Sequence, residues 1–207
     1  MNIKTLVVGT VRANCYFIWN DAACVLIDPG DDFERIETIL EQLGKPLEAI
    51  LLTHGHFDHV GAVKELKARY PQVPVMVGEA DEELLREPER VYKGMLSQIP
   101  DKLHLEADRL LEDGEEINIS GMSFTVIATP GHTKGSVCYL YENAVFSGDT
   151  LFRGTCGRCD FYGGDSRAMG ASLKKLAALE GDRLVYPGHE GETSLEQERK
   201  YNRFMGQ

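Results

Sequence analysis

The chain of 207 residues has no long hydrophobic run and no excess of basic residues. No apolar stretch approaches the roughly 20 residues that span a bilayer, and the N-terminal residues lack the layout of a signal peptide. The formal net charge is −11, which disfavours nucleic acid and anionic membrane surfaces as partners. We therefore expect a cytoplasmic protein whose partners are neither nucleic acid nor membrane. The sequence leaves open whether it forms a homo-oligomer.

Cysteine is scarce as well. There are five cysteines, an odd number with no regular framework, so we expect reduced thiols rather than disulfides. Cys156 and Cys159 form a C-x-x-C, whose alternatives are a redox pair or half of a zinc site. A second C-x-x-C is absent from the sequence, and no thioredoxin-like pattern lies nearby. A turn with two free thiols is the favoured interpretation.

Short apolar runs that end in Gly, Pro or Asp are present throughout and predict buried strands. They cover residues 24–27, 49–52, 124–128, 144–146 and 183–186. Helical periodicity appears between them, at 33–43, 63–70 and 169–176. This mixture predicts one α/β (α+β) domain over residues 1–207. Its strand-rich stretches, 1–78 and 117–189, are compatible with two similar halves packed face to face.

Capping residues predict where two helices begin. Ser166 can cap the helix that contains residues 169–176, and Ser194 to Gln197 fits a capping box before a final helix. Residues 79–108 are charged and mostly helical or irregular. The sequence does not decide whether they form a flap or a surface excursion.

Histidine is concentrated in one stretch. The sequence Thr-His-Gly-His-Phe-Asp-His, residues 53–59, holds three of the six histidines and an aspartate. Protonated imidazoles this close would repel one another, whereas a bound cation would be stabilised, because neutral imidazole and carboxylate are both metal ligands. The pattern therefore predicts a metal site.

The candidate metal ligands all follow predicted strands, and strand ends on one rim of a sheet bring loops together. They are His54, His56, Asp58, His59, His132, Asp149 and His189. Seven ligands are too many for one tetrahedral zinc but suit two ions roughly 3.5–4 Å apart. We expect two divalent ions, with Zn²⁺ favoured and iron or manganese as alternatives.

Other roles were weighed for some of these residues. His132 and His189 could be turn histidines, but their shared Pro-Gly-His setting after a strand favours ligands. Asp149 could serve only its turn, although a two-ion site needs a bridging anion. Asp28 is either a turn former or an acceptor that orients a ligand histidine. His104, outside the pattern, is expected at the surface.

The sequence resembles the metallo-β-lactamase superfamily, and within it the glyoxalase II-like hydrolases. The matching motifs are Asn14-Cys15-Tyr16, Asp28-Pro29-Gly30, Thr53 to His59, Thr129-Pro130-Gly131-His132-Thr133, Ser147 to Phe152 and Pro187-Gly188-His189. They come in the order of the family and cover nearly the whole chain. The resemblance implies a four-layer αββα sandwich with metals at one edge.

The resemblance also implies how the ligands divide. The first ion would take His54, His56 and His132, and Asp149 would bridge the two ions. The second ion would take Asp58, His59 and His189, with Asp58 acting in catalysis beside a metal-bound hydroxide. The flavodiiron branch normally has glutamate at the position of His56, so that branch is disfavoured.

The activity expected from this resemblance is hydrolysis of S-acyl thiols such as S-lactoylglutathione. Two metal ions lower the pKa of a shared water towards 7, and a thiolate with a pKa of about 8.5 leaves without a strong general acid. Only residues 190–207 follow the last candidate ligand, so we expect no added glutathione-binding domain. Arg158 and Lys134 are then the predicted substrate-binding cations, with a structural salt bridge as the alternative for Arg158.

Three alternatives remain at this point. The segment Cys156 to Phe161 also resembles persulfide dioxygenases, which hold one iron at positions matching His54, His132 and Asp149. A lactonase of the same superfamily is the second alternative. The third is a binding protein with a structural metal, which the excess of ligands disfavours.

Overall fold

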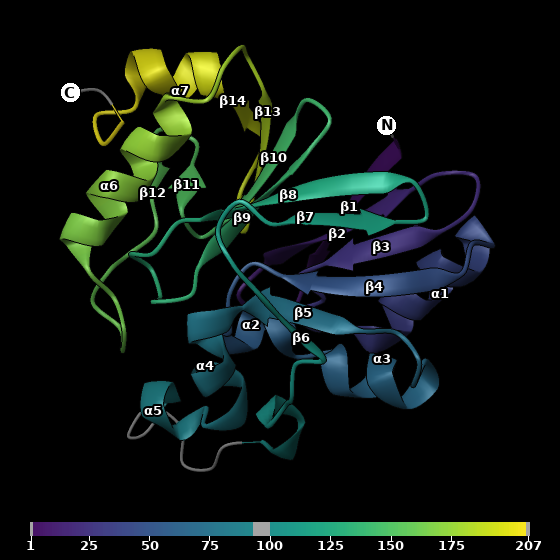
Figure 1. Cartoon of the computed structure of the whole chain (residues 1–207). Helices are drawn as coiled ribbons and strands as arrows, with labels where there is room; N and C mark the ends of the chain where they lie inside the picture. The colour runs from purple at the N-terminus through teal and green to yellow at the C-terminus, as the bar shows by residue number, and fades with distance from the viewer. Residues whose placement is uncertain (1, 93–99, 206–207) are drawn as a thin grey trace.

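The computed structural model describes residues 2–92 and 100–205. Two six-stranded sheets face each other, and helices cover their outer faces (Figure 1). The first sheet has the order β1 (Asn2–Val8), β2 (Ala13–Trp19), β3 (Cys24–Ile27), β4 (Leu47–Leu52), β5 (Val75–Gly78) and β6 (Arg109–Leu111). The second has the order β14 (Thr193–Ser194), β13 (Leu184–Pro187), β10 (Ala144–Gly148), β9 (Val137–Tyr141), β8 (Met122–Ala128) and β7 (Glu116–Ile119).

Helices connect many of these strands or follow them in the chain. They are α1 (Phe33–Leu43), α2 (Phe57–Val60), α3 (Val63–Arg69), α4 (Glu82–Arg86), α5 (Glu89–Tyr92), α6 (Ser166–Ala177) and α7 (Leu195–Tyr201), with the 3-10 turns η1 (Glu79–Asp81) and η2 (Asp101–Leu103). A small two-stranded sheet, β11 (Leu151–Phe152) and β12 (Thr155–Cys156), lies beside the second sheet. Among the residues described, no helix is long and apolar enough to cross a membrane.

The hydrophobic core is divided by the two sheets. Tyr16, Phe124 and Phe146 are among the side chains buried between the sheets. A second cluster lies between the first sheet and helices α1 and α3, and a third lies between the second sheet and helices α6 and α7. Three cores separate four layers, so the αββα prediction is confirmed.

Sequence-based boundaries were mostly accurate. All five predicted strands are present as β3, β4, β8, β10 and β13. Ser194 caps α7 by accepting a hydrogen bond from Gln197 N at 3.3 Å. The cap predicted for α6 was wrong by one residue, because Asp165 accepts from the backbone N–H groups of Arg167 and Ala168. A carboxylate with a short side chain serves this position as well as serine does.

The described residues between β5 and β6, 79–92 and 100–108, form an excursion rather than part of either sheet; the rest of the predicted stretch 79–108 lies outside the described residues. Residues 79–92 fold into η1, α4 and α5, and 100–108 return through η2 to β6. In Figure 1 this excursion lies beside α2, on the side of the sheets where the histidine-rich loop follows β4. It is therefore placed to contribute a wall to any site built there.

Candidate metal centre

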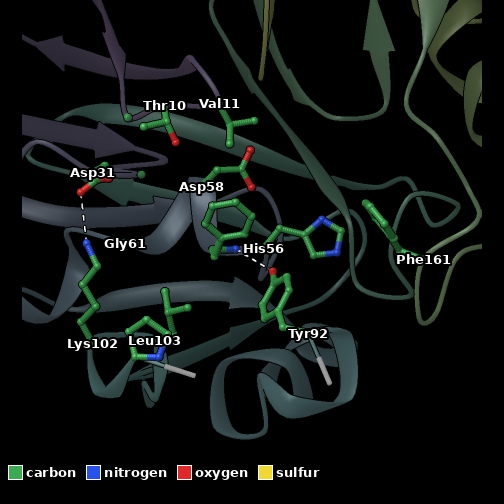
Figure 2. A pocket seen from close by; sticks show the side chains of 14 residues that line it. Thr10, Val11, Asp31, His56, Asp58, Gly61, Tyr92, Lys102, Leu103 and Phe161 are labelled. Atoms are coloured by element: carbon green, nitrogen blue, oxygen red, sulfur yellow. Dashed lines mark hydrogen bonds and ion pairs between the residues drawn. The ribbon is translucent and has the colours of Figure 1, made fainter. Parts of the chain in front are cut away.

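Five loops meet at one edge of the two sheets. Asp28 follows β3, the stretch 54–59 follows β4, His132 follows β8, Asp149 follows β10 and His189 follows β13. The structure brings all seven candidate ligands together there, beside a cavity that His56 and Asp58 help to line (Figure 2).

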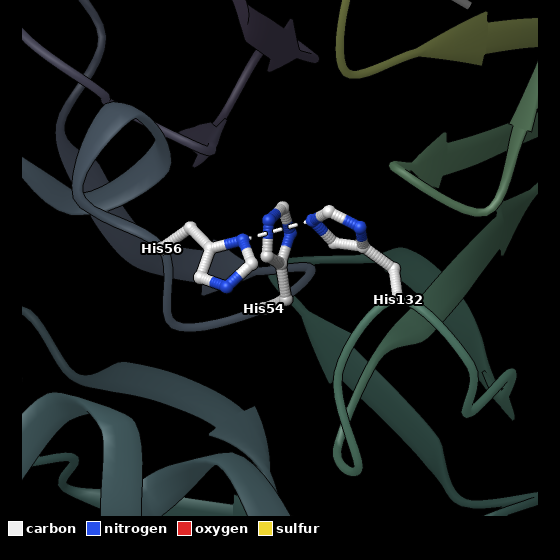
Figure 3. A group of neighbouring side chains, drawn as sticks. All are labelled: His54, His56 and His132. Atoms are coloured by element: carbon white, nitrogen blue, oxygen red, sulfur yellow. Dashed lines mark hydrogen bonds between the residues drawn. The ribbon is translucent and has the colours of Figure 1, made fainter. Parts of the chain in front are cut away.

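Three histidines form a buried group on one side of this cluster. Ring nitrogens of His54, His56 and His132 lie within 4.8 Å of one another. His56 Nδ1 and His132 Nε2 are only 2.8 Å apart and face each other (Figure 3). Nε2 of His54 is buried and has no hydrogen-bond partner among the described residues. Nitrogens left unpaired in this way fit a shared cation.

Hydrogen bonds at the other ring nitrogen fix the direction of these lone pairs. Thr53 Oγ1 donates to Asp28 Oδ2 at 2.6 Å, so it accepts from His54 Nδ1 at 3.1 Å. His132 Nδ1 donates to the carbonyl oxygen of Arg158 at 2.7 Å. His54 and His132 are thus each left with an unprotonated Nε2, as metal-ligating histidines have, whereas His56 turns its Nδ1 towards His132.

Asp58, His59 and His189 form the second group. His189 Nε2 lies 3.2 Å from Asp58 Oδ2 and 3.4 Å from His59 Nε2. His59 Nδ1 donates to Asp28 Oδ2 at 2.9 Å, which directs Nε2 towards Asp58, Asp149 and His189. These separations match the edge of roughly 3.3–3.4 Å that a tetrahedral zinc site with Zn–N of about 2.0–2.1 Å requires.

Asp149 lies between the two groups. Its Oδ1 is 3.5 Å from His59 Nε2, and its Oδ2 is 3.4 Å from His132 Nε2 and 3.6 Å from His189 Nε2. Oδ1 is buried without a hydrogen-bond partner among the described residues. One carboxylate therefore faces both groups of candidate ligands, which is the placement of a bridging ligand. The donor set fits two divalent cations.

The electrostatics of the two sides differ. Burial, together with the neighbouring histidines, lowers the pKa of His54 and brings that of His56 to about 3. Both are neutral imidazoles, the form that binds metal. Burial alone would lower the pKa of His59, but the surrounding carboxylates, Asp149 foremost, raise it to about 10. The carboxylate-rich side therefore holds negative charge that a cation would neutralise.

Asp28 supplies the acceptor that several of these contacts share. It is fully buried, and besides Thr53 Oγ1 and His59 Nδ1 it accepts a hydrogen bond from Thr53 N at 2.7 Å. Its backbone adopts a left-handed conformation with φ of 52°. The geometry therefore combines both sequence interpretations, since the turn aims a carboxylate at a candidate ligand histidine.

The motif Asn14-Cys15-Tyr16 fixes the loop that carries His189. Asn14 Nδ2 donates to the carbonyl oxygens of Pro187 and Glu190 at 2.9 and 3.0 Å. The hydroxyl of Tyr16 donates to the same Pro187 carbonyl at 2.5 Å. Residues from the first sheet thus hold the loop of the second sheet that carries the candidate ligand His189.

Asp81 was not singled out from the sequence. It is fully buried at the end of η1 and joins the two loops that carry the histidine group. Its Oδ2 accepts from Gly55 N at 2.9 Å and from Thr133 Oγ1 at 2.8 Å, and its Oδ1 accepts from Gly135 N at 2.7 Å. A carboxylate soon after the buried strand β5 was the only signal that could have identified it.

Replacing Asp81 by asparagine should loosen the histidine group. The amide nitrogen would face one of the three donors, so a buried N–H or O–H would lose its acceptor at a cost of roughly 1–3 kcal/mol. We expect affinity for the first metal ion to fall about 10- to 100-fold, as for other residues that orient ligands. Competition with a chromophoric chelator measures this. Glu79→Gln, at an exposed position in the same turn, is the control, and equal affinities for the two variants would contradict the assignment.

The two predicted substrate cations lie at the edge of the cluster. Arg158 is exposed, and Asp160 accepts from its Nε and Nη2 at 2.6 and 2.7 Å. Its guanidinium carbon lies 4.1 Å from the centroid of the Phe161 ring. Lys134 lies over Tyr162 at 5.1 Å. Neither lines the cavity beside His56 and Asp58. Arg158 contacts the candidate ligand His132 through its backbone carbonyl oxygen and not through its charged side chain.

The residues that the sequence analysis left outside the metal site also lie outside it in the structure. His104 is 38 % exposed in its side chain and pairs with Glu89 at 2.7 Å. Cys156 and Cys159 are free, partly buried thiols. In the described part of the chain, His104, Cys156 and Cys159 belong to no group of side chains that could hold a metal ion.

Comparison with known proteins agrees with this geometry. The model of the Metallo-beta-lactamase superfamily matches residues 8–189. The chain belongs to that superfamily. It is 36% identical to the probable metallo-hydrolase YqgX of Bacillus subtilis, over 99% of this chain and 98% of the relative. It is also 36% identical to the hydroxyacylglutathione hydrolase GloC of Haemophilus influenzae, over the same shares of the two chains.

Solved structures agree with the fold, and one of them was determined with two metal ions bound. The BLEG-1 B3 metallo-beta-lactamase superposes with a TM-score of 0.92 at 35% identity, over 100% of both chains. TTHA1623, crystallised in a di-iron-bound form, has a TM-score of 0.86 at 38% identity, over 97% of this chain and 99% of its own. ETHE1 from Myxococcus xanthus has a TM-score of 0.80 at 29% identity, over 98% and 84%. Family, relatives and ligand cluster together support a metal-dependent hydrolase with two metal ions.

Proposed function

We propose that this chain hydrolyses S-acyl thiols, S-lactoylglutathione among them, at a site that holds two divalent ions, with Zn²⁺ favoured over iron and manganese. The observation that carries the proposal is the position of Asp149 between two sets of three ligands, next to a cavity that can admit a substrate. The 36% identity to a hydroxyacylglutathione hydrolase supports the thioester.

The chain holds the ions and the substrate in place. We assign His54, His56 and His132 to the first ion, and Asp149 to both. Asp58, His59 and His189 are assigned to the second ion. Such a pair of ions supplies a water that is deprotonated near pH 7 and stabilises negative charge on the acyl oxygen.

Asp58 has a further role in the proposal. Burial would raise the pKa of its carboxyl, but His59 and a hydrogen bond from His189 hold it well below its usual range. An ionised carboxylate at the cavity wall can accept a hydrogen bond from the attacking water and orient it. The thiolate leaves with a pKa of about 8.5, so no strong general acid is needed. A β-lactam nitrogen would need protonation, which disfavours β-lactamase activity.

The second candidate is a persulfide dioxygenase with one iron. The likeness to ETHE1 and the Cys-Gly-Arg segment at 156–158 favour it. A single iron held by His54, His132 and Asp149 would leave Asp58, His59 and His189 without a metal. Their convergence within 4.8 Å favours two ions instead.

Metal analysis joined to turnover tests the proposal. Protein purified without chelator should contain about two ions per chain and should release thiol from S-lactoylglutathione. Removing the metal should abolish thiol release, and adding Zn²⁺ back should restore it. A single iron together with oxygen uptake on glutathione persulfide would replace the hydrolase with the dioxygenase.

A further inference from the structure

A cavity of about 340 Å³ runs from the ligand cluster to the excursion between β5 and β6 (Figure 2). His56 and Asp58 line it on the side of the ligand cluster. Its walls include Val11 in the loop between β1 and β2, Phe57 in α2, and Tyr92 and Leu103 in the excursion. Phe161 closes the side next to His56.

The walls of this cavity are mainly apolar. Val11 is 47% exposed and Phe57 is 38% exposed, so two large hydrophobic side chains remain open to whatever enters. Tyr92 is fixed in the wall, because its hydroxyl accepts a hydrogen bond from Phe57 N at 2.8 Å. Cavities of this size and lining are typical of sites for small apolar groups.

The one lysine that lines the described part of the cavity is already in an ion pair, and this pair lies away from the ligand cluster. Lys102 Nζ lies 3.1 Å from Asp31 Oδ1 at the end remote from His56 (Figure 2). No other Lys or Arg is among the described residues that line the cavity. The carboxylates of a peptide-like thiol such as glutathione would find no unpaired cation there. Arg158 and Lys134 do not line the cavity either.

We propose that this cavity binds the acyl half of the thioester and selects apolar acyl groups, straight-chain or aromatic, over small hydroxylated ones. The inference rests on the proposed hydrolase. The acyl carbon must reach the ligand cluster, and its substituent then enters the cavity while the thiol stays outside. An apolar cavity of roughly 150 Å³ holds a benzene ring, so 340 Å³ accommodates a group of several carbons.

Size and polarity argue against a lactoyl group as the best fit. It would fill a small part of the volume, and its hydroxyl would lose water among apolar walls without a partner. Each methylene that enters should instead raise kcat/KM about fourfold, equivalent to ~0.8 kcal/mol, until the cavity is full.

The test is a series of acyl groups on one thiol. We would measure kcat/KM of the zinc-loaded protein for S-acetyl-, S-butyryl-, S-hexanoyl- and S-lactoylglutathione. We expect S-hexanoylglutathione to exceed S-lactoylglutathione by at least about tenfold. Val11→Asp should reduce the ratio of hexanoyl to acetyl turnover towards one by placing a charge in the wall, and Val11→Trp should reduce it by occupying the space.

Val7→Asp is the matched control. Val7 is 37% exposed at the end of β1, close in sequence to Val11, and it does not line the cavity. That variant should keep the wild-type ratio. Equal kcat/KM for all four esters, with no response to either Val11 variant, would overturn the inference and leave the hydrolase intact. If none of the esters is hydrolysed, the proposed function fails, and this inference fails with it.

Discussion

Asp149→Ala is expected to lower metal content at both sites and hydrolysis by more than about 10²-fold. The two carboxylate oxygens face different histidines, Oδ1 towards His59 and Oδ2 towards His132 and His189. Removing them leaves two cations close together with no anion between them. Residues that only orient ligands already cost about 10- to 100-fold when replaced, so a shared ligand should cost more. Elemental analysis and thiol release measure the two effects.

A matched control for this variant is His104→Ala. His104 is a histidine of the same chain, but its side chain is 38% exposed and its ring pairs with Glu89. It should keep both ions and full turnover. Loss of one ion alone from Asp149→Ala would show that the carboxylate belongs to a single site. Unchanged metal content and turnover would remove Asp149 from the centre altogether.

The sequence was most informative where strands end. A buried strand followed by Pro-Gly-His or by Ser-Gly-Asp predicts both an element and the chemical group at its tip, and His132, His189 and Asp149 all lie at the edge where the loops meet. The resemblance supplied the four layers, because pairing between distant strands cannot be derived from local patterns. Strands outside the five predicted were missed, β1 and the buried β2, β5 and β9 among them. In β1 most side chains are exposed or half-buried, which gives a weak signal.

The sequence was least informative about contacts between distant segments. Asp81 acts through Gly55, Thr133 and Gly135, and nothing in its own neighbourhood marks that role. Arg158 was singled out for its charge, but its guanidinium forms an ion pair with Asp160. Tyr92 and Leu103 line the cavity only because the excursion packs beside α2, far from both residues in the sequence. Long-range packing determines all three, and no local propensity encodes it.

Gly30→Ala is expected to lower the free energy of unfolding by about 3 kcal/mol or more. A Cβ at this position would lie 1.6 Å from the carbonyl oxygen of Asp58 and 2.6 Å from its carbonyl carbon. These are backbone atoms, so no side-chain rotation relieves the clash, and overpacking of this kind costs about 1–3 kcal/mol or more. The turn and helix α2 would have to separate, which would displace Asp58 and His59 together. Urea denaturation should show a lower midpoint, and metal binding should weaken at the second group.

Gly170→Ala separates this effect from the general consequences of replacing glycine. Gly170 lies inside α6, and a Cβ there meets no atom within 4 Å. Alanine should stabilise that helix by roughly 0.5–1 kcal/mol, because it loses less backbone entropy on folding. The two substitutions add the same methyl group and should move the urea midpoint in opposite directions. A Gly30→Ala midpoint equal to that of the wild type would mean that the Asp28-Pro29-Gly30 turn does not pack against α2 as closely as the structure places it.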